Sequence, residues 1–325
     1  MVSMDRRAFL SSGLIAVTTA FVTVPACGAK EAGMPFFQSH QLSMGVQLFA
    51  LAADLARDFD GTLQAVAKTG YRTVELAGYH DRTATQIRLA LDAAGLSCRG
   101  IHVQPDPVAG RSGPSLNGDI AAIITDSRAL GTTDVILPIF LMPRRFVAPA
   151  GADRIRTLRA AGEALVADDW KYIADFLNAK GRELQSEGLR MGYHNHHFEF
   201  APLRGGTTGF DILLRETDPS LVFFELDVGW VMGGGSDPVD MLQAHQGRFA
   251  KMHVKDVVPS TNPDFEGGVA PTEVGSGMID WRRLLPAAYA AGVRDFVVEQ
   301  EPPFAGPPID SLAKSFAYLN QIETA

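Results

Sequence analysis

The sequence has few cysteines and no surplus of positive charge. Its 325 residues include only Cys27 and Cys98, which excludes a disulfide framework and a thiolate metal site. Cys98 is expected to be a small buried apolar residue. Lys and Arg number 29 against 37 Asp and Glu, so the net charge is −8. This argues against nucleic acid as the main partner, because phosphate binding needs a Lys and Arg surplus.

The sequence also lacks an apolar run long enough to cross a bilayer comfortably, which takes about 20 residues. The run 13–24 is shorter and follows Arg6 and Arg7, so it resembles the core of a twin-arginine export signal. We therefore expect residues 1–30 to be a signal peptide and the mature protein to be periplasmic or in the cell envelope. A lipoprotein-like cleavage box ends at Cys27, so a lipid anchor there is a further expectation. The alternative is a disordered tail with a chance arginine pair.

Short apolar segments alternate with amphipathic segments through the rest of the chain. Glycines such as Gly70 and Gly95 follow helical segments, as is typical of helix ends, and an apolar segment begins soon afterwards. Repeated units of this kind predict a parallel sheet with helical crossovers, and eight units predict an α/β fold with one closed (β/α)8 TIM barrel over residues 43–325. The expected strands are 44–50, 73–76, 97–103, 134–139, 190–194, 222–227, 250–254 and 295–299. The expected helices are 60–69, 84–94, 118–130, 165–187, 207–217, 238–246, 281–291 and 310–321.

A doubly wound open sheet is the alternative, but no Gly-x-Gly-x-x-Gly follows the first strand, which weakens a dinucleotide-binding version. The insertion 140–169 is expected to be a loop or lid over one end of the barrel.

Polar residues stand near the end of nearly every expected strand, where TIM barrels carry their chemistry. A ring of buried charges needs a common partner, and a divalent cation is the simplest. One residue from each of four successive strands supplies the best ligand set: His194, Asp227, His253 and Glu299. Two imidazoles and two carboxylates favour Mn, Zn or Co over Mg or Ca. The alternative is that these side chains are hydrogen-bonded wall residues without a metal.

Other residues near the strand ends receive secondary roles. Lys255 either stabilises an oxyanion or pairs with Asp256. Carboxylates outside the ligand set are expected to orient ligands or form salt bridges. This group comprises Glu225, Glu301 and Asp256. The histidines His80, His197 and His245 are expected on the surface or in loops.

Six motifs together resemble the sugar phosphate isomerase/epimerase family, whose members have a xylose isomerase-like TIM barrel. The resemblance runs from about Ser43 to the C-terminus. It implies a metal shell of Glu, Asp, His and Glu, in which Asp227, His253 and Glu299 match and His194 replaces the first Glu. The histidine-rich strand is closer to the dehydratase and lyase branches. The motifs are Gly45–Leu48, Gly70–Leu76, Tyr193–Phe200, Leu226–Trp230, His253–Asp256 and Gly275–Trp281.

The resemblance implies a metal-dependent carbohydrate isomerase or epimerase that removes a proton next to a carbonyl through a metal-stabilised enediolate. The alternatives are a lyase or dehydratase that eliminates a β-oxygen from a keto-sugar or 3-keto-glycoside, and a non-catalytic sugar-binding envelope protein. Export favours a free or oxidised sugar or a glycoside over a sugar phosphate as the substrate. The sequence does not indicate whether the protein forms an oligomer. The expected catalytic residues are Glu299, His102, Lys255 and Glu199. The expected substrate-binding residues are Glu75, His196, Gln47 and Trp230.

Overall fold

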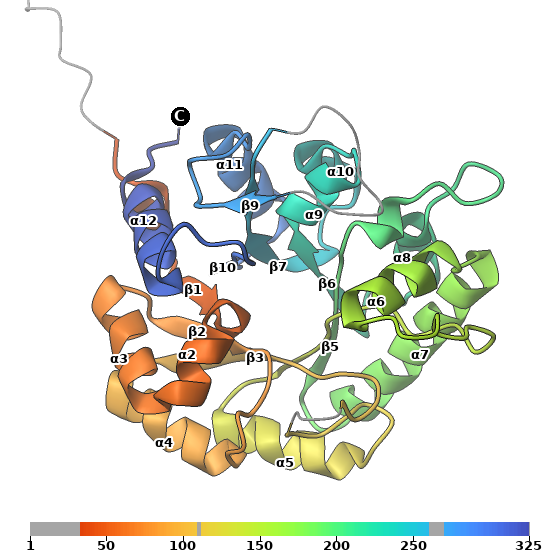
Figure 1. Cartoon of the computed structure of the whole chain (residues 1–325). Helices are drawn as coiled ribbons and strands as arrows, with labels where there is room; N and C mark the ends of the chain where they lie inside the picture. Colours follow the sequence, from red (N-terminus) through yellow and green to blue (C-terminus); the bar gives the residue numbers. More distant parts are fainter. Residues whose placement is uncertain (1–32, 109–111, 260–269, 325) are drawn as a thin grey trace, which may run out of the picture. The chain divides into compact units, whose positions relative to one another are not determined.

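Eight parallel strands close into a barrel in the computed structural model, which describes residues 33–108, 112–259 and 270–324. Their order around the barrel is β1-β10-β7-β6-β5-β4-β3-β2, and the barrel closes where Val46 of β1 pairs with Val298 of β10. Figure 1 shows the strands surrounding the centre and the larger helices outside them. The predicted (β/α)8 barrel is confirmed. The barrel strands are β1 Met44–Gln47, β2 Thr73–Leu76, β3 Ser97–His102, β4 Asp134–Leu137, β5 Arg190–His194, β6 Val222–Asp227, β7 Phe249–Val254 and β10 Asp295–Val298.

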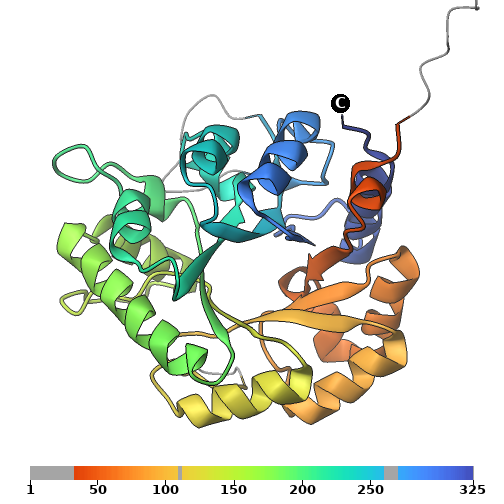
Figure 2. The ribbon, with the colours of Figure 1, turned by 180° about the vertical axis from the view of Figure 1, so that it is seen from behind.

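One main helix follows each barrel strand, and each lies within three residues of its predicted bounds. Gly95 and Gly131, with φ of +70° and +74°, end two of them in the left-handed conformation that suits glycine. Seen from behind in Figure 2, α4 and α5 lie side by side outside the strands. The main helices are α3 Phe59–Thr69, α4 Ala84–Ala94, α5 Ile120–Leu130, α7 Ala167–Gln185, α8 Gly209–Glu216, α10 Pro238–Ala244, α11 Trp281–Ala291 and α12 Pro308–Gln321.

The structure adds shorter elements that the sequence pattern did not predict. Strand β1 ends at Gln47 and not at residue 50, because the Gln47 side chain accepts a hydrogen bond from Phe49 N and begins a 3-10 turn over residues 48–51. The insertion 140–169 contains a helix, α6, as well as loops. The added elements are α1 Phe36–Ser39, η1 Leu48–Leu51, α2 Ala52–Arg57, α6 Arg154–Glu163, η2 Phe198–Phe200, α9 Val228–Gly233, β8 Asp256–Val257 and β9 Pro271–Thr272.

The interior of this barrel is strongly polar, whereas branched apolar side chains fill most TIM barrels. Lys251 is fully buried and its Nζ lies 2.7 Å from Glu75 Oε2 and 3.2 Å from Asp295 Oδ2. Burial and Glu225 act to raise the pKa of Glu75, but Lys251 and His102 outweigh them and hold it at about 2. A buried charge is tolerated only when it is paired. These pairs therefore form a charged floor beneath the mouth of the barrel.

The predicted signal peptide and Cys27 lie outside the described residues. Among the described residues, no helix combines the length and the hydrophobicity that a membrane crossing needs. Cys98 is buried, as expected, and burial raises the pKa of its thiol to about 12. The thiol is therefore an apolar packing group and not a nucleophile.

Candidate metal centre and its cavity

Four side chains converge at the C-terminal mouth of the barrel. His194 ends β5, Asp227 ends β6, His253 lies near the end of β7, and Glu299 directly follows β10. Each offers one ligand atom, and these atoms all lie within 4.8 Å of one another. All four residues are buried. Two imidazoles and two carboxylates at this spacing fit a divalent transition-metal ion.

Asp227 is positioned by its backbone and by its neighbour Asn195. The Asn195 side chain accepts from Asp227 N at 3.0 Å and donates to Asp227 O at 3.2 Å, which ties the ends of β5 and β6 together. The Oδ1 atom of Asp227 accepts from Trp230 N and caps helix α9. The Oδ2 atom accepts no hydrogen bond of good geometry, and it faces His194, His253 and Lys255. It is therefore held ready for a cation.

A second group of residues satisfies the same ligand spacing: His102, His194, Glu225 and His253. It shares both histidines with the first group but approaches them from the opposite side. His253 Nδ1 faces Glu299 Oε2 at 3.1 Å, whereas its Nε2 faces Glu225 Oε2 at 3.1 Å. A neutral imidazole has one lone pair, so each histidine serves only one group at a time. The first group has two carboxylates to balance a dication, so it fits a divalent cation better than the second group does.

Glu225 connects the second group as a shared carboxylate. Its Oε2 lies 2.9 Å from His102 Nε2, 3.1 Å from His253 Nε2 and 3.3 Å from His194 Nδ1. When His194 Nδ1 and His253 Nε2 carry the ring protons, the lone pairs are on His194 Nε2 and His253 Nδ1. These two nitrogens lie 4.0 and 3.8 Å from Asp227 Oδ2, on the side of the first group. Glu225 thus lies behind two expected ligands, as carboxylates behind metal-binding histidines commonly do, and Glu75 Oε1 also contacts His253 Nε2 at 2.8 Å.

Lys255 is the main cation at the mouth, and it does not pair with Asp256. Its buried Nζ lies 2.9 Å from Asp227 Oδ2, 2.8 Å from Glu299 Oε2 and 3.0 Å from Glu301 Oε1. Burial acts to lower its pKa, but these carboxylates raise the pKa of Lys255 well above its ordinary value. A Cβ at Gly229 would lie 2.7 Å from Lys255 Cγ, so the glycine makes room for the stem.

Asp256 has a different role from the one expected beside Lys255. Its carboxylate accepts hydrogen bonds from the backbone N–H groups of Gly275, Gly277 and Ile279 and from Trp281 Nε1. It therefore organises the segment that leads into α11 and lies outside the metal centre.

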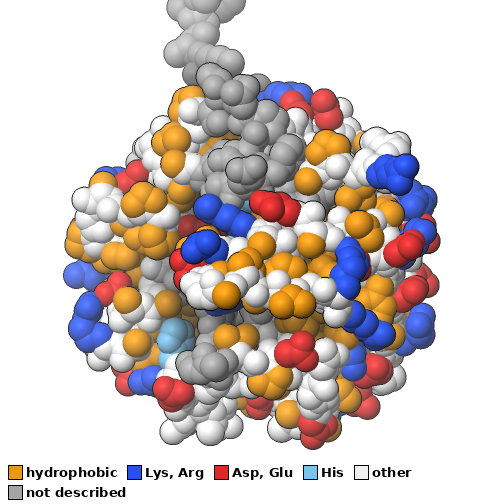
Figure 3. Space-filling model, turned by 45° about the vertical axis from the view of Figure 1, so that its right-hand side comes forward, with side chains coloured by type: hydrophobic (Ala, Val, Ile, Leu, Met, Phe, Trp, Pro, Cys, Tyr) orange, Lys and Arg blue, Asp and Glu red, His pale blue; other side chains and the backbone are white. Residues whose placement is uncertain are grey.

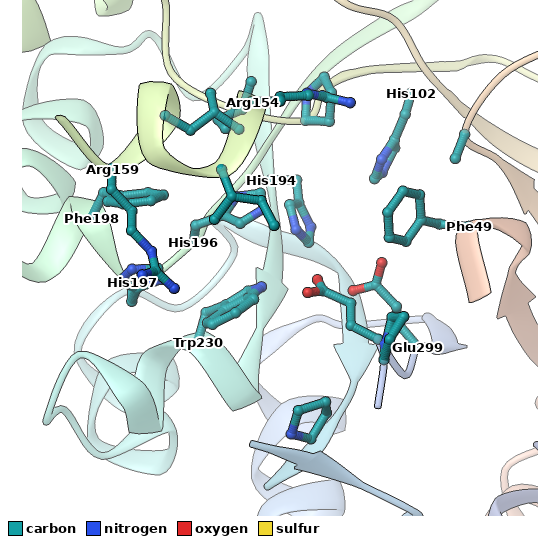
Figure 4. Close-up of a pocket in the computed structure, with 18 of the residues that line it drawn as sticks. Phe49, His102, Arg154, Arg159, His194, His196, His197, Phe198, Trp230 and Glu299 are labelled. Carbon is teal, nitrogen blue, oxygen red and sulfur yellow. The ribbon is translucent and has the colours of Figure 1, made fainter. Parts of the chain in front are cut away.

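A cavity of about 510 Å³ opens directly above these residues. Figure 4 shows His102, His194, Trp230 and Glu299 around the cavity, with Phe49 and Phe198 on opposite sides. The volume lies within the range of small-molecule sites, about 300–1,000 Å³. The other lining residues are Ala77, Gln104, Pro138, Ile139, Arg154, Ile155, Leu158, Arg159, His196, His197, Pro271, Glu301 and Pro302.

The ionisable groups of the cavity have distinct environments. Burial acts to lower the pKa of His102, but Glu75 and Glu225 raise it to about 9. Burial, His194 and Lys255 lower the pKa of His196 well below its ordinary value. Burial acts to raise the pKa of Glu299, but Lys255 and His253 hold it well below its ordinary range. Burial and Glu299 raise the pKa of Glu301, although Lys255 opposes them.

A family model described as a xylose isomerase-like TIM barrel matches residues 63–322. The chain belongs to this family. It is 28% identical over 153 residues to an inosose dehydratase of Clostridium beijerinckii. The aligned region covers 43% of this chain and 50% of the relative. The chain thus matches about half the length of this curated relative.

Solved structures give the same fold. A sugar phosphate isomerase/epimerase of Parabacteroides distasonis is 25% identical, with a TM-score of 0.67 over 85% of this chain and 97% of that chain. A 3-keto-D-glucoside 4-epimerase of E. coli is 15% identical, with a TM-score of 0.59 over 86% of this chain and all of the other. At that identity the second likeness shows the fold alone.

Within this xylose isomerase-like barrel, some predicted site residues lie away from the cavity. Gln47 Nε2 donates to Glu75 Oε1, and both side chains are fully buried in the barrel below the histidines. Glu199 is also buried, and it accepts from Tyr193 Oη at 2.6 Å and from His196 N at 3.0 Å. It anchors the loop and does not line the cavity, although we expected it among the catalytic residues. His197 is buried in the cavity wall and not on the surface.

Two residues at the mouth and in the interior of the barrel have larger roles than the sequence predicted. Glu301 was expected only to orient a ligand or form a salt bridge, but it lines the cavity and contacts Lys255. Lys251 was not singled out, although it alternates with His253 along β7 and with Lys255 just after the strand, and so faces the same interior. This alternation is the sequence pattern from which the interior position of Lys251 could have been predicted.

Proposed function

We propose that this protein is a metal-dependent lyase that acts on a keto-sugar or keto-cyclitol and eliminates an oxygen substituent β to the carbonyl. One observation carries the proposal. Among the described residues that line the cavity, the carboxylates are Glu299, which belongs to the ligand set, and Glu301, which does not. The other polar lining residues are uncharged or cationic side chains, among them the imidazoles of His102 and His196. One carboxylate outside the ligand set, in a cavity that also offers proton donors, suits elimination, whereas two opposed carboxylates suit epimerisation.

The metal would be held by His194, Asp227, His253 and Glu299. It would supply Lewis-acid stabilisation of negative charge on the carbonyl oxygen. Glu301 is the proposed general base, because it lines the cavity outside the ligand set and because burial raises its pKa, which strengthens it as a base.

His102 is the proposed general acid. It lines the cavity, and its pKa of about 9 keeps it protonated at neutral pH. Its Nε2 proton is held by Glu75 and Glu225, each at 2.9 Å, so the proton on Nδ1 is the one to donate. His196 and Trp230 form the neighbouring wall, with ring centroids 5.6 Å apart, and are proposed to bind the sugar face and hydroxyls.

The proposed reaction balances without an added oxidant or reductant. Glu301 takes the proton from the carbon next to the carbonyl, and the electrons of that C–H bond form a carbon–carbon double bond. The bond from the β-carbon to oxygen breaks, and the oxygen leaves with its electron pair and a proton from His102. The products are an unsaturated ketone and water or an alcohol.

Epimerisation or isomerisation is the second candidate, because it begins with the same proton removal. The structural relative named as a sugar phosphate isomerase/epimerase favours it, whereas the inosose dehydratase favours elimination. Because of the predicted export signal, we also propose that the protein works in the periplasm or cell envelope. We propose a free or oxidised sugar or a glycoside as its substrate there.

Deuterium exchange tests the proposal. Keto-sugars, keto-cyclitols and 3-keto-glycosides are incubated in deuterated water with the protein and Mn²⁺, Zn²⁺ or Co²⁺. We expect an unsaturated ketone, detected by its ultraviolet absorbance, and loss of activity by about 10²–10⁴-fold in Glu301→Gln. Deuterium incorporation without loss of an oxygen substituent would establish the epimerase instead. A metal-loaded protein that gives neither product nor exchange would be a sugar-binding protein.

A further inference from the structure

Two ligand groups compete for a cation at the mouth of this barrel, and the number of carboxylates does not by itself decide between them. The first group contains Asp227 and Glu299, whereas the second contains Glu225. However, Glu75 Oε1 lies 2.8 Å from His253 Nε2, directly beside the second group. When Glu75 is included, each group has two carboxylates. A cation needs a further reason to prefer the first group.

Lys251 supplies that reason, because its ammonium lies close to both carboxylates of the second group. Its Nζ is 2.7 Å from Glu75 Oε2 and 3.8 Å from Glu225 Oε1. Glu225 on β6 is the register partner of Lys251 on β7, so the two side chains face the same interior. A dication in the second group would share both carboxylates with this ammonium. Like charges repel strongly in a buried site, where little water screens them.

Lys251 is held in place below the second group. Its side chain is fully buried, and its three N–H donors face three acceptors. These are Glu75 Oε2, Asp295 Oδ2 at 3.2 Å and Arg99 O at 3.1 Å. A Cβ at Gly100 would lie 2.9 Å from Lys251 Nζ, so the glycine makes room for the ammonium. Lys and Arg side chains on the surface stand in water among Asp and Glu, as Figure 3 shows for one face, whereas the charge of Lys251 is enclosed in the barrel.

The first group also has an ammonium beside it, but this one has other partners to turn to. Lys255 Nζ contacts Asp227 and Glu299 of the first group. It also lies 3.0 Å from Glu301 Oε1 and 4.4 Å from the centroid of the Trp230 ring, and both of these residues line the cavity outside the group. They remain as partners when Asp227 and Glu299 bind a cation. The first group can therefore accept an ion without leaving a buried ammonium unpaired.

We infer that Lys251 is a resident cation that excludes divalent ions from the second group and so confines a metal ion to the first group. It is a positioning residue, since it lies outside both ligand groups and acts through Glu75 and Glu225. Lys251 and Lys255 lie four residues apart, yet only Lys255 yields to a metal ion. The inference rests on the proposed metal centre, and it holds for elimination and epimerisation alike.

The position of zinc in Lys251→Met tests the inference. Anomalous diffraction from crystals of the zinc-loaded wild-type protein should show the ion at the first group. In Lys251→Met, Glu75 and Glu225 lose their ammonium, so the zinc peak should move to the second group. Lys255→Met is the matched control, because it removes the same charge four residues further along the chain. Its zinc should stay at the first group.

Calorimetric titration with Zn²⁺ measures the same shift in solution. Glu299→Gln removes a ligand of the first group, so it should weaken zinc binding at least about tenfold in the wild-type background. In the Lys251→Met background the same change should alter the affinity less than about threefold, because the ion no longer binds Glu299. Lys251→Met/Asp295→Asn repeats both measurements in a variant that loses one charge of each sign, in case Lys251→Met alone fails to fold.

Zinc that stays at the first group in the variants without Lys251, or that no longer binds to them, would overturn the inference. Zinc at the second group in the wild-type protein would do so as well, as would an equal effect of Glu299→Gln in every background. Relocation of zinc in a protein that shows no elimination would retain the inference and reject the proposed reaction. Elimination by a protein whose zinc position does not depend on Lys251 would do the reverse.

Discussion

The imidazole of His194 lies with Nδ1 3.3 Å from Glu225 Oε2 and with Nε2 4.0 Å from Asp227 Oδ2. The first contact holds the ring so that the second nitrogen faces the mouth of the barrel. His253 is held in the same way, with Nε2 3.1 Å from Glu225 Oε2 and Nδ1 3.1 Å from Glu299 Oε2. Glu225 therefore lies behind both histidines of the proposed ligand set, and Glu75 Oε1, 2.8 Å from His253 Nε2, shares the orientation of that ring.

Glu225→Gln should weaken metal binding by about 10–100-fold, because the amide is a poorer acceptor for the two ring N–H groups. The fold should persist, since the amide keeps the size of the side chain. Calorimetric titration of the metal-free protein with Zn²⁺ measures the affinity. Glu187→Gln, on the surface beside Arg128, is the control and should bind like wild type. Equal affinities in both variants would show that Glu225 does not orient the ligands.

Lys255→Met should destabilise the metal-free protein by about 3–5 kcal/mol, because it leaves three carboxylates without their buried cation. These are Asp227, Glu299 and Glu301. A bound dication restores the charge balance, so metal should raise the melting temperature more in the variant than in wild type. Thermal melts with excess Mn²⁺ and with chelator test this.

The control for that variant is Lys171→Met. Lys171 is half exposed and pairs with Asp168 on the surface, so its loss should cost less than about 1 kcal/mol and leave the metal effect unchanged. Equal responses of Lys255→Met and wild type to metal would mean that the ion binds away from these carboxylates.

Glu199→Gln should change how stability depends on pH. Burial raises the pKa of Glu199 from 4.5 to about 7, although its hydrogen bonds from Tyr193 and His196 oppose this. Between these values the folded protein holds a proton that the unfolded chain has lost. The free energy of unfolding of wild type therefore falls as pH rises from about 4.5 to 7, by up to about 3 kcal/mol.

The glutamine variant lacks this titration and should lose less stability over the same interval. Denaturant unfolding of both proteins at pH 5, 6, 7 and 8 measures the difference. Parallel stability profiles would show that Glu199 does not titrate in the folded protein near neutral pH.

The barrel and the four proposed ligands follow from the sequence because their signals are local. Strand alternation places His253 and Lys255 on one face, and glycines such as Gly95 mark helix ends. The spacing of His194 and Asp227 at consecutive strand ends then brings them to the same mouth. In a barrel of parallel strands, the C-terminal ends of all strands lie at the same mouth, so residues at those ends come close together.

The remaining features depend on contacts between distant segments, which no local pattern contains. Glu75 and Gln47 stand at strand ends like true site residues, but Lys251 draws Glu75 into the charged floor. Glu199 follows His196 in sequence, yet Tyr193 holds it away from the cavity. Helix α6 has a polar, arginine-rich composition, and only its packing against Phe198 reveals it as a cavity wall.

The most direct test of the metal centre is anomalous diffraction from crystals of the zinc-loaded protein. The account predicts one strong zinc peak at about 2.0–2.2 Å from His194 Nε2, His253 Nδ1 and carboxylate oxygens of Asp227 and Glu299. A zinc peak coordinated by His102 and Glu225, or no peak at this mouth at saturating zinc, would contradict it.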